Sequence, residues 1–107
     1  MTCVVKLTDR AKCDLREIAL HIAEQTGDKS VAISFIRELQ EKVQIIQTFP
    51  QSGAIPKDRI LKSHGYRFLV HKDYLIFYLY KEDEHIAYVT AVFHGRRDYM
   101  RMIKNIM

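Results

Sequence analysis

Apolar residues recur every three or four positions through the first half of the chain, which is the spacing of one helix face. A short strand rich in β-branched residues is predicted at 3–8, before this pattern starts. The first helix should end at Gly27, and a second should begin at Asp28 or Ser30 and end before Pro50. The repeating positions are Ala11, Leu15, Ile18 and Ile22, then Ala32, Phe35, Leu39, Val43 and Ile46. Two such helices form a hairpin whose apolar faces must cover another layer.

The second half of the chain has the composition of strands, with apolar runs rich in β-branched and aromatic residues. A loop containing both prolines is predicted at 49–58, and strands are predicted at 64–72, 73–81 and 84–95. The connections between these strands are tight, which predicts an antiparallel meander. A short last helix is predicted at 97–106. The order β-α-α-β-β-β-α predicts a small α+β fold, a helical hairpin packed on a curved sheet.

Length and composition place the chain among ordinary globular proteins. It has 107 residues, of which 48% are hydrophobic and 28% charged, so residues 1–107 are expected to form a single domain. The formal net charge is +4 and the sequence pI about 9.1. This balance favours polyanions or acidic proteins as partners.

The sequence contains no pattern that predicts a disulfide framework, a metal site or a cofactor. Cys3 and Cys13 are interpreted as two reduced thiols. No histidine lies four residues from another or beside a Cys-x-x-Cys motif, so no metal is expected. The histidines are His21, His64, His71, His85 and His94. No segment has the length of a membrane span or a signal sequence, and the protein is therefore expected in the cytoplasm with no membrane role.

One candidate chemistry is cleavage of RNA through its 2′-hydroxyl. That reaction needs a base, an acid and cations for the charge that develops on phosphorus. The candidate catalytic residues are His64, Arg67, His94, Arg97 and Tyr99, which lie at predicted strand ends. A sheet could present such residues together, although each one taken singly is more simply read as a solvated surface residue.

Basic residues gather in two stretches with few opposing acids. The first stretch holds Lys57, Arg59, Lys62, Arg67 and Lys72, and the second holds Arg96, Arg97, Arg101 and Lys104. This pattern is typical of contact with phosphates or with an acidic partner segment, and a solvated rim is the alternative. The tyrosines of the predicted strands are interpreted as sheet packing rather than as a platform for stacking bases.

Four motifs, in this order along the chain, resemble the toxins of the RelE/ParE superfamily, and specifically its ParE-like branch. They are Pro-x-x-Gly at 50–53, Gly-Tyr-Arg at 65–67, Tyr-Leu-Ile-Phe-Tyr at 74–78 and Val-x-His-Gly-x-Arg-Asp at 92–98. The resemblance covers nearly the whole chain. It implies the toxin of a type II toxin–antitoxin system, which arrests growth and is neutralised by an antitoxin that wraps an acidic, amphipathic segment over it. Such a complex binds its operator DNA through the antitoxin.

The resemblance implies two possible mechanisms. ParE-like toxins inhibit DNA gyrase without known hydrolytic chemistry, and the ending at 92–98 favours this function. RelE-like toxins are ribosome-dependent mRNA endonucleases, and Arg67 and Arg97 stand at two of their characteristic positions, with Tyr99 closer to Arg97 than their pattern places it. Contacts with the target or with phosphate are expected from Lys62, Arg67, Arg96, Arg97 and Arg101. A third possibility is a degenerate toxin that acts mainly as an antitoxin-binding corepressor.

Overall fold

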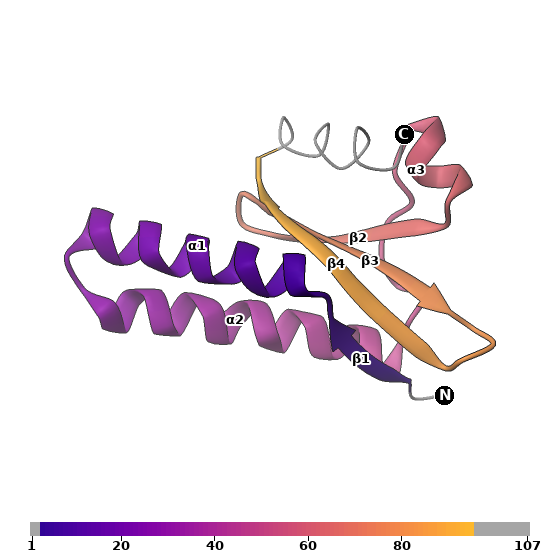
Figure 1. Ribbon diagram of the computed structural model, residues 1–107, viewed down its shortest axis with the longest axis horizontal. Helices are drawn as coiled ribbons and strands as arrows, with labels where there is room; N and C mark the ends of the chain where they lie inside the picture. Colours follow the sequence, from indigo (N-terminus) through magenta and orange to yellow (C-terminus); the bar gives the residue numbers. More distant parts are fainter. Residues whose placement is uncertain (1–2, 96–107) are drawn as a thin grey trace.

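The computed structural model describes residues 3–95 and confirms the predicted α+β arrangement (Figure 1). The last predicted helix, at 97–106, lies outside the described residues. The elements are β1 Val4–Leu7, α1 Asp9–Thr26, α2 Lys29–Thr48, α3 Arg59–Ser63, β2 Tyr66–His71, β3 Tyr74–Lys81 and β4 Ile86–His94. Within this range no helix is long and apolar enough to cross a membrane.

The four strands form one sheet in the order β1-β4-β3-β2. β2, β3 and β4 pair in the predicted antiparallel meander, and β1 joins the sheet beside β4 and parallel to it. β2 and β4 therefore run in the same direction. β1 pairs with β4 only as far as Val89, because the chain turns there into α1. Beyond that point the side of β4 faces helix α1 instead of another strand.

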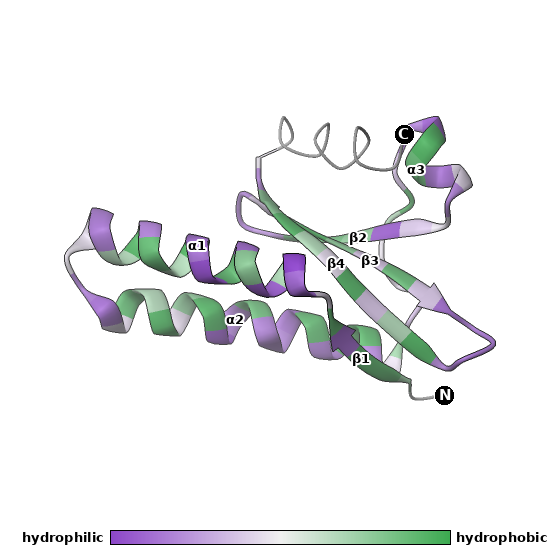
Figure 2. Ribbon diagram, viewed as in Figure 1, coloured by the Kyte–Doolittle hydropathy of each residue, from purple (hydrophilic) through white to green (hydrophobic). Residues whose placement is uncertain are grey.

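The helical hairpin covers one face of the sheet, and its ends are formed as the sequence indicates. The Thr8 side chain accepts a hydrogen bond from the Ala11 N–H at the start of α1. Gly27 has a left-handed φ of 68°, which lets the chain reverse, and Asp28 caps α2. Apolar residues recur along both helices and along the central strands, as Figure 2 shows. Leu39 and Ile46 are buried against the sheet with Tyr78.

A second, smaller core lies on the other face of the sheet, beneath a helix that the sequence pattern did not predict. Helix α3 has five residues, capped by the Asp58 carboxylate, and its Leu61 is fully buried against Phe77 and Phe93. Five residues are too few to display a helical period, which is why this element escaped prediction. Its C-terminal cap, His64, and Gly65 delay the start of β2 to Tyr66, two residues later than predicted.

The last strand is shorter than predicted because of the turn that precedes it. β4 begins at Ile86 rather than at residue 84, because His85 takes a left-handed φ of 56° in the β3–β4 turn. At the other end of the sheet, the β2–β3 turn is tied to helix α2. The Glu38 carboxylate lies 2.9 Å from His71 Nε2 and 3.2 Å from Lys72 Nζ. Cys3 is buried and Cys13 is exposed, and the two are not bonded to each other.

Candidate functional site

The Pro50–Gly53 motif is bound to the centre of the sheet through a buried tyrosine. The Tyr78 hydroxyl donates to the Pro50 carbonyl oxygen at 2.8 Å and accepts from the Gly53 N–H at 2.9 Å. Burial raises the pKa of Tyr78, so the hydroxyl keeps the proton that it donates. A Cβ atom on Gly53 would lie 2.5 Å from Tyr78 Oη, so only glycine fits at this position. The motif therefore has a structural role: this joint attaches the chain that follows α2 to the centre of the sheet.

Arg67, a predicted target or catalytic residue, contributes to the same joint. It pairs with Tyr78 across β2 and β3, and its Nη1 donates to the Gly53 carbonyl oxygen at 3.0 Å. The side chain is half-buried, and a guanidinium has five N–H donors in all. Arg67 can therefore orient the motif and still present donors to a negatively charged partner.

His64 and Lys62 lie near Arg67 in the chain, at the end of α3. His64 is exposed, and its Nδ1 lies 2.8 Å from the Ile60 carbonyl oxygen of the same helix. Lys62 is exposed on the last turn of α3. Lys62 and His64 thus precede β2, and Arg67 is the second residue of that strand.

His94 lies at the opposite end of the sheet. It is paired with Tyr74 at the start of β3, with ring centroids 4.9 Å apart. Arg67 is paired with Tyr78, so four residues of β3, or roughly 13 Å along the strand, separate the levels of Arg67 and His94. His64 and Arg67 therefore belong to the end of the sheet where β2 begins, and His94 lies at the other end. The other predicted site residues, Arg96, Arg97, Tyr99 and Arg101, lie outside the described residues.

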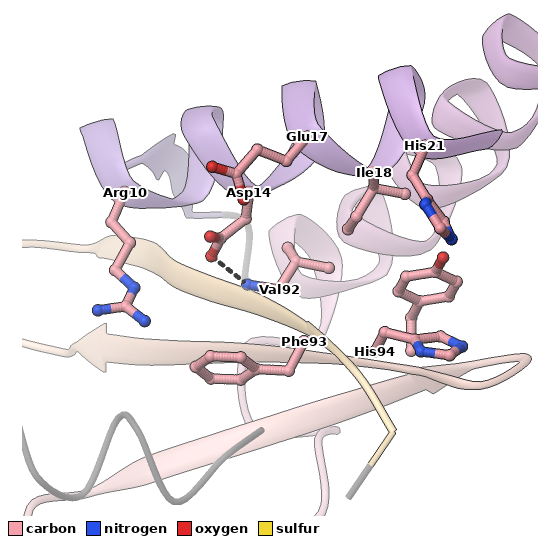
Figure 3. Close-up of a pocket in the computed structure, with 9 residues that line it drawn as sticks. Arg10, Asp14, Glu17, Ile18, His21, Val92, Phe93 and His94 are labelled. Carbon is pink, nitrogen blue, oxygen red and sulfur yellow. Dashed lines mark hydrogen bonds between the residues drawn. The ribbon is translucent and has the colours of Figure 1, made fainter. Parts of the chain in front are cut away.

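His94 borders a cleft that sequence reasoning missed. The cleft has a volume of about 250 Å³ and lies between α1 and the end of β4 (Figure 3). Its polar lining comes from Arg10, Asp14, Glu17, His21 and His94. The first four of these residues recur at intervals of four, three and four, which is the spacing of one helix face. That polar stripe is the signal by which the cleft could have been found.

Asp14 links helix α1 to strand β4 beside this cleft. Its Oδ2 accepts a hydrogen bond from the Val92 N–H at 3.0 Å, on the side of β4 that β1 no longer covers. Burial raises the pKa of the Asp14 carboxyl, and the bond from Val92 and the charge of Arg10 oppose that shift. The Arg10 guanidinium lies over the Phe93 ring, 5.6 Å from its centroid. The cleft thus combines a half-buried carboxylate acceptor, Asp14, with one cation, Arg10.

The two candidate catalytic histidines among the described residues lie far apart. General acid–base catalysis requires a proton donor and acceptor within hydrogen-bond reach of one substrate. His64 and His94 are at opposite ends of the sheet, so they cannot act on one phosphate together. Residues 3–95 also hold no group of three His, Cys, Asp or Glu side chains that could bind a metal ion.

A four-stranded sheet with a parallel first strand, covered by a helical hairpin, is the fold of the solved RelE and ParE toxins. The family model described as "ParE toxin of type II toxin-antitoxin system, parDE" matches residues 5–99. The chain belongs to this ParE toxin family. No curated protein matches the sequence.

Solved structures share the fold. The chromosomal ParDE toxin–antitoxin system from P. aeruginosa matches with a TM-score of 0.73 and 18% identity, over 89% of this chain and 98% of that chain. The free E. coli toxin RelE matches with a TM-score of 0.65 and 14% identity, over 100% of both chains. The RelBE2 toxin–antitoxin complex from Mycobacterium tuberculosis matches with a TM-score of 0.58 and 17% identity, over 88% of this chain and 99% of that chain. At these identities the likeness concerns the fold.

Proposed function

We propose that this type II toxin arrests growth by binding and inhibiting DNA gyrase. The observation that carries the proposal is the match of residues 5–99 to the ParE family, to whose gyrase-directed branch the motif at 92–98 also points. The separation of His64 and Arg67 from His94 supports a function that needs binding and no proton transfer. The toxin is then a non-enzymatic inhibitor that needs no cofactor, and residues 1–107 act as one toxin domain.

The proposed partners follow from the same family. A cognate antitoxin neutralises the toxin, as toxin–antitoxin complexes among the structural neighbours suggest, and operator DNA is contacted through the antitoxin. The target side of the molecule includes Lys62 and Arg67, together with Arg96, Arg97 and Arg101 of the C-terminal segment. Because gyrase acts on the chromosome, the proposed site of action is the cytoplasm.

The second candidate function is ribosome-dependent mRNA cleavage. Arg67 favours it, because this half-buried arginine keeps donors that could bind a phosphate. In that case His64, Arg67, His94, Arg97 and Tyr99 are the candidate catalytic residues. Their roles can be tested separately from the fold, since His64 and His94 are exposed and their loss opens no cavity in the core.

Two histidine substitutions distinguish the candidates. Under the proposed function, His64→Ala and His94→Ala should each keep growth arrest within a few-fold of wild type, because neither imidazole transfers a proton. A general acid or base contributes about 100-fold to 10,000-fold to a rate, so a nuclease that uses either residue would lose nearly all toxicity. Growth after induction, with mRNA cleavage mapped by primer extension, gives the answer. Loss of toxicity together with loss of cleavage in either variant would refute the gyrase proposal.

A further inference from the structure

Strand β4 contains one extra residue, Thr90, halfway along its pairing with β3. The register shifts at this point, so Thr90 is the one residue of β4 that the described sheet leaves without a partner on β3. Such a β-bulge turns every later side chain of its strand to the other face. Val89 and Val92 accordingly both pack in the core beneath the hairpin, although strict alternation would put them on opposite faces. The bulge thereby directs Val92 and His94 toward the side of helix α1 (Figure 3).

Side chains of helix α1 and of its cap bind β4 from the bulge onward, where β1 no longer accompanies it. The Thr8 hydroxyl donates to the Thr90 carbonyl oxygen at 3.1 Å. Asp14 Oδ2 accepts from the Val92 N–H at 3.0 Å. Thr90 and Val92 are alternate residues of the strand, and these are the positions at which a neighbouring strand would form its hydrogen bonds. Side chains of the helix therefore take the place of the missing strand.

Beyond these two bonds the chain leaves the sheet at Gly95. The Gly95 N–H donates to the Asp73 carbonyl oxygen at 2.6 Å, on the side of β3. Its φ of 76° is left-handed, so the backbone departs here from the direction of the strand. Arg96 follows Gly95 directly in the sequence. The end of β4 is thus held by β3 on one side and by Asp14 on the other, just before the basic residues of the C-terminal segment.

We propose that Asp14 is a positioning residue for target binding: by holding Val92, it fixes the place at which β4 delivers the arginines that follow Gly95. Asp14 acts through the strand and does not itself touch the target. The bulge makes this support necessary, because an unpaired residue disrupts the hydrogen-bond ladder around it. The inference rests on the proposed function, and it adds a residue of helix α1 to a site that the sequence motifs assign to the strand and the segment after it.

The test compares three variants of the full-length toxin for inhibition of purified gyrase in a supercoiling assay. Asp14→Ala removes the acceptor of the Val92 N–H, and Asp14→Asn keeps an oxygen there. The control, Val43→Ala, removes core contacts of the other helix of the hairpin. All are assayed well below their unfolding midpoints. We expect Asp14→Ala to need about 10-fold more toxin for half-inhibition, and the other two variants less than about threefold more.

Amide hydrogen exchange provides a readout that a general loss of stability would not reproduce. Asp14→Ala should speed exchange at the Gly95 amide by about 10-fold relative to the amides at the centre of β3, because only the end of β4 is released. Val43→Ala lowers stability without releasing that end, and it should leave this ratio within about twofold of the wild-type value.

The inference would be overturned if Asp14→Ala inhibited gyrase as well as wild type, if Val43→Ala lost as much inhibition, or if relative exchange at Gly95 did not change. If wild-type toxin itself does not inhibit gyrase, the proposed function fails instead. The same variants are then compared for growth arrest, a readout that does not depend on the identity of the target. Equal arrest by Asp14→Ala and Val43→Ala would overturn the inference in that case too.

Discussion

Replacing Gly53 with alanine should destabilise the toxin by about 3 kcal/mol, the upper part of the range for overpacking a buried position. The added Cβ would lie 2.5 Å from Tyr78 Oη and 2.7 Å from Cε1 of the same ring. The ring cannot move aside, because Tyr78 is fully buried in the centre of the sheet. Both hydrogen bonds of its hydroxyl would be distorted, along with the Arg67 contact to the Gly53 carbonyl. Urea unfolding of the purified variant measures the loss.

The matched control is Gly27→Ala at the turn of the helical hairpin. Gly27 has a φ of 68°, and no atom lies within 4 Å of its Cβ position, so alanine there adds backbone strain without a clash. We expect a cost of about 1 kcal/mol from that strain. A Gly53→Ala variant no less stable than Gly27→Ala would show that the Pro50–Gly53 motif is not packed against Tyr78 as described.

Replacing Asp14 with alanine should destabilise the fold by about 2 kcal/mol, because it leaves the buried Val92 N–H without an acceptor. Asp14→Asn keeps an oxygen at this position and should cost far less. The comparison, made by thermal or urea unfolding at pH 7, isolates the hydrogen bond from the charge. Equal losses in the two variants would assign the role of Asp14 to its charge, for example toward Arg10.

The asparagine variant also carries a pH signature. Burial raises the pKa of Asp14 in the folded state, so folding favours its protonated form. The stability that this group contributes is full below the unfolded pKa and is lost as the pH rises through the folded pKa. Asparagine has no charge to bury, and the stability of Asp14→Asn relative to wild type should therefore increase between pH 4 and pH 7.

The helices and the meander were predictable because each is encoded by a local pattern. The apolar stripe from Ala32 to Ile46 is buried as its spacing indicates, and Gly27 supplies the left-handed turn between the helices. Two features depend on contacts remote in sequence and were not accessible in this way. The parallel pairing of β1 with β4 joins segments about eighty residues apart, and the bond from Arg67 to Gly53 depends on how a loop folds over the sheet.

The separation of the candidate site residues could also have been predicted from the sequence. In a meander the first and third strands run in the same direction, so the start of β2 and the end of β4 must lie at opposite ends of the sheet. That rule separates His64 and Arg67 from His94 without coordinates. The cleft beside His94 could not be placed so simply, since it depends on which turn of α1 faces the uncovered part of β4.

Pulse-labelling of DNA and protein synthesis, in the first minutes after the chain is induced without its antitoxin, tests most directly whether the toxin acts on gyrase. The proposed function predicts that incorporation of labelled thymidine falls first, together with a loss of negative supercoiling in a reporter plasmid, while incorporation of labelled methionine continues. A collapse of methionine incorporation before any change in DNA synthesis or supercoiling would contradict it and would identify the ribosome as the target.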